Sequence, residues 1–101
     1  MRIDPLNHAA VARFIDLTLG EFYRRFKEYF GNTFTFVLID NEGDYGNYIA
    51  WTASLFEEFQ AAKGYELEKY LPLLVYEGGK QTPKVRIDYL RTISDLYQNK
   101  Y

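Results

Sequence analysis

The chain has 101 residues, 48% hydrophobic and 19% aromatic, and its 12 basic and 14 acidic side chains leave a net charge of -2. This length allows one domain, residues 1–101, and the hydrophobic content excludes intrinsic disorder. The charge balance lacks the basic field that attracts phosphate backbones, so we expect no nucleic-acid partner, and the absence of cysteine excludes disulfides, thiolate catalysis and zinc–thiolate sites.

Membrane and export signals are missing from the sequence. No apolar run reaches the ~18 residues that cross a bilayer, and the start MRIDPLNHAA lacks the apolar stretch of a signal peptide. We therefore expect a soluble chain without a membrane partner. Localisation stays open, because a secreted or periplasmic parent protein would carry its signal elsewhere.

A long amphipathic helix is predicted for the N-terminal third. Asn7 is a candidate N-cap, and apolar or partly apolar side chains then recur every three or four residues at Val11, Phe14, Ile15, Thr18, Phe22, Phe26 and Tyr29. Gly31-Asn32 is expected to end this helix, since glycine adopts the left-handed C-cap conformation without a steric penalty.

One strand is predicted after the first helix. The run Thr33 to Ile39 (TFTFVLI) combines β-branched and aromatic residues without polar alternation, which is typical of a strand covered on both faces. A sheet needs at least two strands, and we find one. Its partners therefore lie outside the chain or in a second copy, or the run packs as irregular core.

The second half is predicted to be helical. A helix starts at Thr52 or at a Ser54-x-x-Glu57 capping box and ends at Gly64. A short helix at residues 65–71 is expected to stop at Pro72, and residues 77–80 form a turn. Thr82-Pro83 opens the last helix, whose predicted apolar side consists of Ile87, Leu90, Ile93, Tyr97 and Tyr101.

Short motifs that match a known family run through the chain. They are Asn7, Ala10, Phe14, Tyr29-Phe30-Gly31, Asp40-Asn41-Glu42-Gly43-Asp44-Tyr45-Gly46, Ala50-Trp51-Thr52, Gly64-Tyr65, Tyr70-Leu71-Pro72-Leu73-Leu74, Arg86, Asp88-Tyr89 and Ser94-Asp95-Leu96-Tyr97. In order and spacing, from about Ile3 to Tyr101, they resemble the catalytic-barrel segment of glycoside hydrolase family 106, the bacterial α-L-rhamnosidase-type enzymes.

The resemblance implies an α/β fold, a mostly helical part of a (β/α)8 barrel with one main strand. A complete barrel takes ~250 residues, so we expect a fragment of a TIM-barrel glycosidase that is inactive alone. The alternative is a small, mostly helical oligomeric scaffold or interaction module without catalysis. Self-association of the isolated chain is expected in either case, because unpaired strand edges and uncovered aromatic faces find partners.

The loop after the strand holds the candidate site for a carbohydrate substrate. The resemblance implies that Glu42 is the catalytic acid of an inverting hydrolysis, with a second carboxylate ~6.5 to 9.5 Å away on another strand outside this chain. Asp40 and Asp44 would orient Glu42, bind sugar hydroxyls or raise the pKa of Glu42 by like-charge repulsion. Tyr45 and Trp51 would stack on a sugar face.

Other interpretations of this loop stay open. Asp-Asn-Glu-Gly-Asp after a strand is commonly a solvated turn in which Asx side chains cap backbone groups. Asp40, Glu42 and Asp44 also stand at positions one, three and five of a calcium loop, but glycine falls at position seven and Trp51 at position twelve, which excludes an EF-hand. A looser calcium site stays open, no other cofactor is expected, and Trp51 could serve packing instead of binding.

Overall fold

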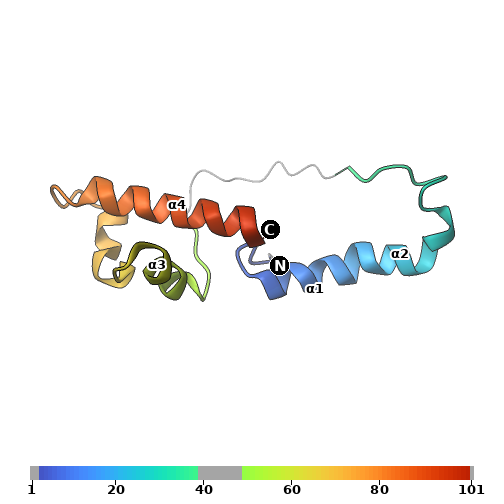
Figure 1. Ribbon diagram of the computed structural model, residues 1–101, viewed down its shortest axis with the longest axis horizontal. Helices are drawn as coiled ribbons and strands as arrows, with labels where there is room; N and C mark the ends of the chain where they lie inside the picture. The colour runs from blue at the N-terminus through green and yellow to red at the C-terminus, as the bar shows by residue number, and fades with distance from the viewer. Residues whose placement is uncertain (1–2, 39–48, 101) are drawn as a thin grey trace.

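The computed structural model describes residues 3–38 and 49–100 (Figure 1). Its helical segments are α1 His8–Ile15, the π-helical η1 Asp16–Gly20, α2 Glu21–Phe26, the 3-10 segment η2 Lys27–Tyr29, α3 Leu55–Lys63, the 3-10 segment η3 Leu67–Leu74 and α4 Thr82–Lys100. No strand occurs in the described ranges, where an isolated bridge joins Phe30 and Phe34. The described fold is therefore mostly helical.

The first four helical segments follow one another as a single rod, as the sequence predicts. The side-chain oxygen of Asn7 accepts a 3.2 Å hydrogen bond from the Ala10 amide, which confirms the N-cap. The rod ends before Gly31, whose φ of 86° is the left-handed conformation expected there. In Figure 1 the rod extends away from the other helices.

The apolar stripe of this rod is largely uncovered. Val11 is buried, whereas large members of the predicted stripe such as Phe14 and Phe22 are more than half exposed. A helix face of this composition normally packs against a core. The stripe is present as predicted, but residues 3–38 and 49–100 supply no cover for most of it.

The structure does not show the predicted strand buried on both faces, since residues 33–38 form no strand. Phe34 forms the isolated bridge to Phe30, and the following residues make no ladder. Phe36 and Leu38 are 80% and 78% exposed. The physical reason is that a strand needs a paired backbone on at least one side, and the described residues provide none. Ile39, the last residue of the predicted strand, lies outside the described residues.

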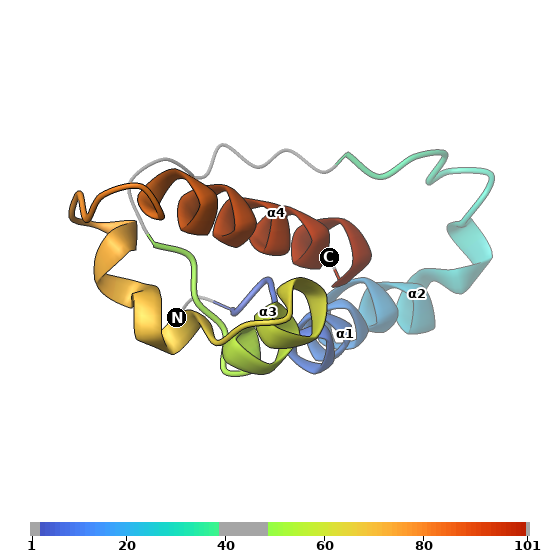
Figure 2. The ribbon, with the colours of Figure 1, turned by 60° about the vertical axis from the view of Figure 1, so that its left-hand side comes forward.

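The core lies between α3, η3 and α4 (Figure 2), with η3 and α3 both packed against α4. Its buried side chains are Leu6, Leu55, Phe59, Leu67, Val85, Tyr89, Ile93 and Leu96. Leu6 belongs to the turn before α1, so this side chain ties the start of the rod to the helical core.

The ends of α3 follow the sequence in part. Gly64 has a φ of 80° and forms the predicted C-cap. Ser54 is the N-cap residue, but its side chain makes no capping hydrogen bond, so the capping box is wrong. The Leu55 amide donates instead to the backbone oxygen of Thr52 at 3.1 Å. This backbone turn satisfies the first amide of α3, whereas the serine was expected to accept from the amide of Glu57.

Pro72 does not end the short helix as predicted. It lies inside η3, which continues to Leu74. The φ fixed by the proline ring, about -65°, falls within the range of a 3-10 helix, so the ring is compatible with this segment.

The last helix begins at Thr82 as predicted, but it buries a different side. The buried positions are Thr82, Val85, Tyr89, Thr92, Ile93 and Leu96. Ile93 is common to the predicted and the observed side, whereas Ile87 and Leu90 are exposed. Because α4 has apolar residues on more than one side, its contacts with α3 and η3 decide which side is buried.

The chain is extended for its size. It measures 60 × 25 × 23 Å with a radius of gyration of 18.2 Å, whereas a compact domain of this length has about 13 Å. Its accessible surface is 8212 Å², compared with about 6,000 Å² for a compact monomer of the same mass. Much apolar surface that a compact domain would bury is therefore exposed.

Candidate functional site

Most of the predicted site lies outside the described residues. These positions are Asp40, Glu42, Asp44 and Tyr45. Trp51 is described, as are the two flanks of the loop, residues 34–38 before it and residues 49–52 after it. The geometry of these flanks is what the structure contributes to the candidate site.

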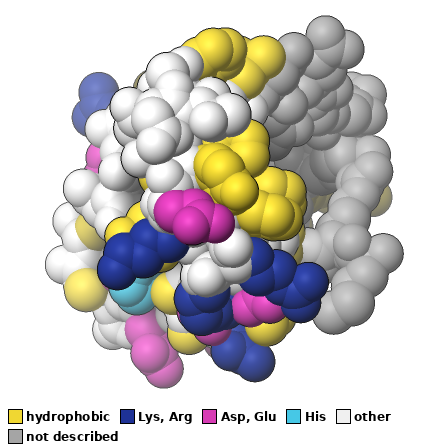
Figure 3. All heavy atoms as spheres, turned by 90° about the vertical axis from the view of Figure 1, so that its right-hand side faces the viewer, with side chains coloured by type: hydrophobic (Ala, Val, Ile, Leu, Met, Phe, Trp, Pro, Cys, Tyr) yellow, Lys and Arg dark blue, Asp and Glu magenta, His cyan; other side chains and the backbone are white. Residues whose placement is uncertain are grey.

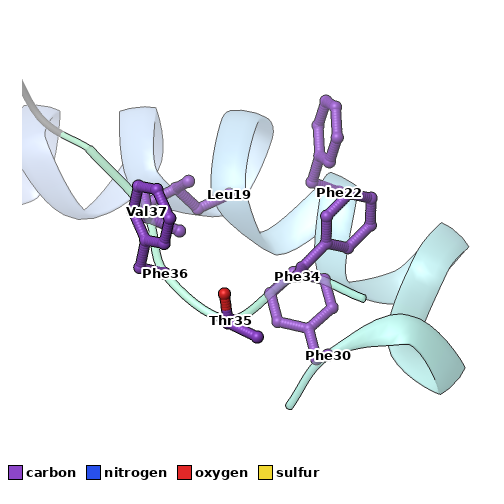
Figure 4. Close-up of a pocket in the computed structure, with 7 residues that line it drawn as sticks. All are labelled: Leu19, Phe22, Phe30, Phe34, Thr35, Phe36 and Val37. Carbon is purple, nitrogen blue, oxygen red and sulfur yellow. The ribbon is translucent and has the colours of Figure 1, made fainter. Parts of the chain in front are cut away.

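The first flank borders an apolar groove of about 460 Å³ between the rod and the segment that runs back along it. The lining residues are Leu19, Phe22, Phe30, Phe34, Thr35, Phe36 and Val37. Figure 4 shows these side chains coming from the helix on one side and from the extended segment on the other. Val37, the last of these lining residues, stands three positions before Asp40 in the sequence.

Aromatic contacts fix the fold of this flank. The Phe34 ring meets the rings of Phe26, Tyr29 and Phe30 edge to face, at centroid distances of 6.3, 6.3 and 5.6 Å. Such pairs stabilise by about 0.5–1.5 kcal/mol each beyond their buried area. Phe34 was predicted to lie in a buried strand, and its contacts with these three rings were not predicted. The aromatic residues on both sides of Gly31 were the available signal.

The second flank is held by two hydrogen bonds from distant parts of the chain. Tyr89 on α4 donates to the backbone oxygen of Ala50 at 2.7 Å. The hydroxyl of Thr52, 2% exposed, donates to the carboxylate of Asp4 at 2.7 Å. The other carboxylate oxygen of Asp4 accepts from the Leu6 amide at 3.0 Å. Sequence analysis did not foresee these contacts, since nothing local marks residues that are 48 positions apart.

Tyr89 is suited to this role at all ordinary pH values. Burial raises the pKa of its phenol above the usual 10.0. The phenol therefore remains a neutral donor to the Ala50 carbonyl.

Trp51 lies between the two fixed residues. Its indole meets the Phe56 ring edge to face, with the centroids 4.9 Å apart and an interplanar angle of 86°. The residue is nevertheless 51% exposed. Trp51 thus combines a packed edge with an exposed surface.

A second polar cluster joins the link between α3 and η3 to α4. Asp88 accepts hydrogen bonds from the Tyr65 hydroxyl at 2.8 Å and from the Lys84 ammonium at 2.6 Å. Lys84 also lies 4.5 Å from the centre of the Tyr65 ring. The hydrogen bond from Lys84 lowers the pKa of Asp88, and burial raises the pKa of Tyr65. These groups satisfy one another, so the cluster is structural.

The charges on the rod also pair with one another. Asp16 binds Arg13 and Arg24, and Glu21 binds Arg24 and Arg25. These ion pairs, led by the hydrogen bond from Arg24, lower the pKa of Asp16. Figure 3 shows the end of the rod, where hydrophobic side chains adjoin charged ones. Arg24 and Arg25 thus belong to an exposed, ion-paired face of the rod.

Metal-binding clusters and membrane-spanning helices are both absent from the described residues. Within residues 3–38 and 49–100, no three His, Cys, Asp or Glu side chains gather in a way that could bind a metal ion. In the same ranges, every helix is too short or too polar to cross a membrane.

Comparison with known proteins identifies the class. The family model of glycoside hydrolase family 106, described as alpha-L-rhamnosidase, matches residues 1–101. The chain belongs to this family of glycoside hydrolases, which confirms the resemblance found in the sequence.

A curated relative shows how small a part of a longer enzyme this sequence spans. The chain is 30% identical over 105 residues to a Formosa agariphila protein named "Putative beta-glucuronidase". The match covers 100% of this chain but 9% of that protein. No solved structure matches the chain.

Proposed function

We propose that residues 1–101 are one segment of a (β/α)8-barrel catalytic domain of an α-L-rhamnosidase-type glycoside hydrolase, with the acidic loop at its active site. One observation carries the proposal. Residues Phe36, Val37 and Leu38, directly before the loop, are apolar and exposed in an extended segment that has no strand partner among the described residues. A barrel strand has this composition, and neighbouring strands would cover it.

The uncovered rod supports the same arrangement. In a (β/α)8 barrel each strand is flanked by helices whose apolar side faces the strands. The rod carries an exposed apolar stripe that such packing would bury. The exposed surface above that of a compact monomer agrees with a chain whose remaining contacts are made by other parts of the same domain.

The chemistry assigned to the loop is general acid catalysis by Glu42. A protonated carboxyl group delivers its proton to the leaving oxygen while a second carboxylate activates water. On this proposal the second carboxylate comes from another strand, so residues 1–101 alone are inactive. Asp40 and Asp44 would position Glu42 or bind sugar hydroxyls, and Tyr45 and Trp51 would stack on the sugar.

The test is the Glu42→Gln variant of the full-length protein that contains this segment. Two α-L-rhamnosides are compared, one with a nitrophenol leaving group and one with an alkyl alcohol, and a β-glucuronide is included because of the relative's name. We expect a loss of about 10²- to 10⁴-fold in kcat for the alkyl rhamnoside, since general acid catalysis contributes about that much. The nitrophenyl substrate should lose less, because its leaving group needs little protonation.

The matched control is Glu57→Gln, which removes an exposed carboxylate from α3. It should leave both rates unchanged. A Glu42→Gln enzyme that cleaves both rhamnosides as fast as the unmodified enzyme would refute the assignment.

The second candidate function is the oligomeric scaffold, and the same exposed apolar groove favours it. On that alternative the groove is covered by another copy, and the chain needs no flanking sequence. A full-length protein without glycosidase activity, together with a stable oligomer of residues 1–101, would support the scaffold over the hydrolase.

A further inference from the structure

We propose that Tyr89 and Thr52 are positioning residues that hold the backbone on both sides of Trp51 and so present its indole as a stacking surface for a sugar ring. This inference rests on the proposed function for the identity of the substrate, a glycoside. The positioning itself rests on contacts that the structure describes.

Burial alternates along residues 50–52. Ala50 accepts a hydrogen bond from buried Tyr89, and Thr52 is itself buried, whereas Trp51 between them is 51% exposed. Ala50 packs against the buried cluster and Thr52 is buried, so the residues on both sides of Trp51 face the core. Holding these two residues there leaves the indole between them on the outer side.

The hydrogen bonds of Tyr89 and Thr52 are both anchored in the core. Tyr89 belongs to the buried cluster of α4, and Asp4, the acceptor for Thr52, is joined to buried Leu6 by the Leu6 amide. The flank is thus attached to α4 on one side and to the turn before α1 on the other. These anchors set the position of the chain where it leaves the loop.

The indole of Trp51 is also in contact with a neighbouring ring. Phe56, on the first turn of α3, meets the Trp51 ring edge to face. This contact limits the rotation of the indole but leaves half of its surface free. A restrained aromatic ring loses less conformational entropy when it binds than a mobile one does. The arrangement therefore suits a sugar-stacking surface better than it suits a core residue.

The positioning can be tested without any substrate, because Trp51 is the single tryptophan of the chain. The quenching of its fluorescence by acrylamide is measured in residues 1–101. We expect Tyr89→Phe and Thr52→Val to raise the quenching constant toward that of the urea-unfolded chain. Thr52→Ser, which keeps the hydroxyl donor, should have the same quenching constant as the unmodified chain.

The control for this measurement is Tyr76→Phe, which removes a hydroxyl from an exposed residue. It should leave the quenching constant of Trp51 unchanged. Equal quenching in Tyr89→Phe and the unmodified chain would overturn the positioning role. The role would also be overturned if the unmodified chain had the same quenching constant as the unfolded chain. Residues 50–52 would then not be held.

The link to the substrate is tested by a double-mutant cycle in the full-length hydrolase. Tyr89→Phe should raise the KM for the rhamnoside about 2- to 10-fold, the equivalent of one hydrogen bond, and leave kcat nearly unchanged. In a Trp51→Ala background the same substitution should have no further effect on KM, because it acts through the indole. Additive effects, or a loss confined to kcat, would overturn the proposal.

The two tests separate this inference from the proposed function. If the fluorescence results hold and Glu42→Gln leaves the activity intact, the assignment of the acidic loop fails while the positioning of Trp51 stands. If Glu42→Gln abolishes activity and the quenching constants do not change, the positioning fails alone.

Discussion

The hydroxyl of Tyr65 donates a 2.8 Å hydrogen bond to the carboxylate of Asp88, and this bond fastens the link between α3 and η3 to α4. Lys84, one turn earlier on α4, binds the same carboxylate oxygen. We expect Asp88→Asn to destabilise the fold by about 1 kcal/mol, because the hydrogen bonds lose their charged acceptor and Lys84 is largely solvated. Urea unfolding measures this, with exposed Asp95→Asn as a neutral control.

The contribution of Asp88 should depend on pH in a defined direction. Lys84 lowers the pKa of Asp88 in the folded chain below the ordinary value of 3.8. The ionised form is therefore stabilised by folding, and this stability is present above the unfolded pKa and is lost as the pH falls through the folded pKa. The difference in unfolding free energy between the unmodified chain and Asp88→Asn should shrink below pH 3.8. A difference that stayed constant into strong acid would contradict this.

The buried side of α4 can be tested with two truncations. Ile93 is 8% exposed and Leu90 is 62% exposed. Ile93→Ala should destabilise the isolated chain by about 2–5 kcal/mol, because it leaves a cavity in the core. Leu90→Ala should change the stability by less than about 0.5 kcal/mol. Equal losses in thermal or urea unfolding would mean that α4 packs with the other side inward.

Gly64 provides a test of the end of α3. Its φ of 80° is strained for any side chain, although no atom lies within 4 Å of the position that a Cβ would take. Gly64→Ala should therefore cost about 1 kcal/mol through backbone strain alone. Gly64→Asn should cost less, because asparagine tolerates the left-handed conformation. An alanine variant as stable as the unmodified chain would show that α3 does not end in this conformation.

The exposed segment before the acidic loop should drive self-association of the isolated chain. Phe36 and Leu38 are apolar, almost fully exposed and without a strand partner among the described residues. Sedimentation at increasing concentration should show dimers or larger species, because unpaired apolar edges associate. Phe36→Asp with Leu38→Asp should shift the chain toward monomer, whereas Tyr76→Asp, also at an exposed position, should not. A monomer at all concentrations would contradict the expectation.

Local signals predicted the helices well. Asn7, Gly64 and Thr82 mark the ends that the structure shows, because capping depends on a few neighbouring residues. The Ser54 capping box and the stop at Pro72 failed, since the Ser54 side chain makes no capping hydrogen bond and a 3-10 helix accommodates the proline.

The candidate site was predictable only in its chemistry. The roles of Asp40, Glu42, Asp44 and Tyr45 come from the resemblance and remain predictions. For Trp51 the sequence left packing and stacking open, and the structure shows both a packed edge and an exposed surface. Nothing in the sequence pointed to Asp4 or Tyr89, because their partners are distant along the chain.

By itself the sequence determined the family, the helical character of most of the chain and the helix ends at Asn7, Gly64 and Thr82, since all of these depend on local residue types and their spacing. The tertiary structure alone decided which side of α4 is buried, that Thr52 meets Asp4 and that Tyr89 meets Ala50. It also left residues 34–38 exposed instead of burying them in a sheet. The reason is that burial and pairing depend on which other segments are present, and an apolar run specifies a need for neighbours without supplying them.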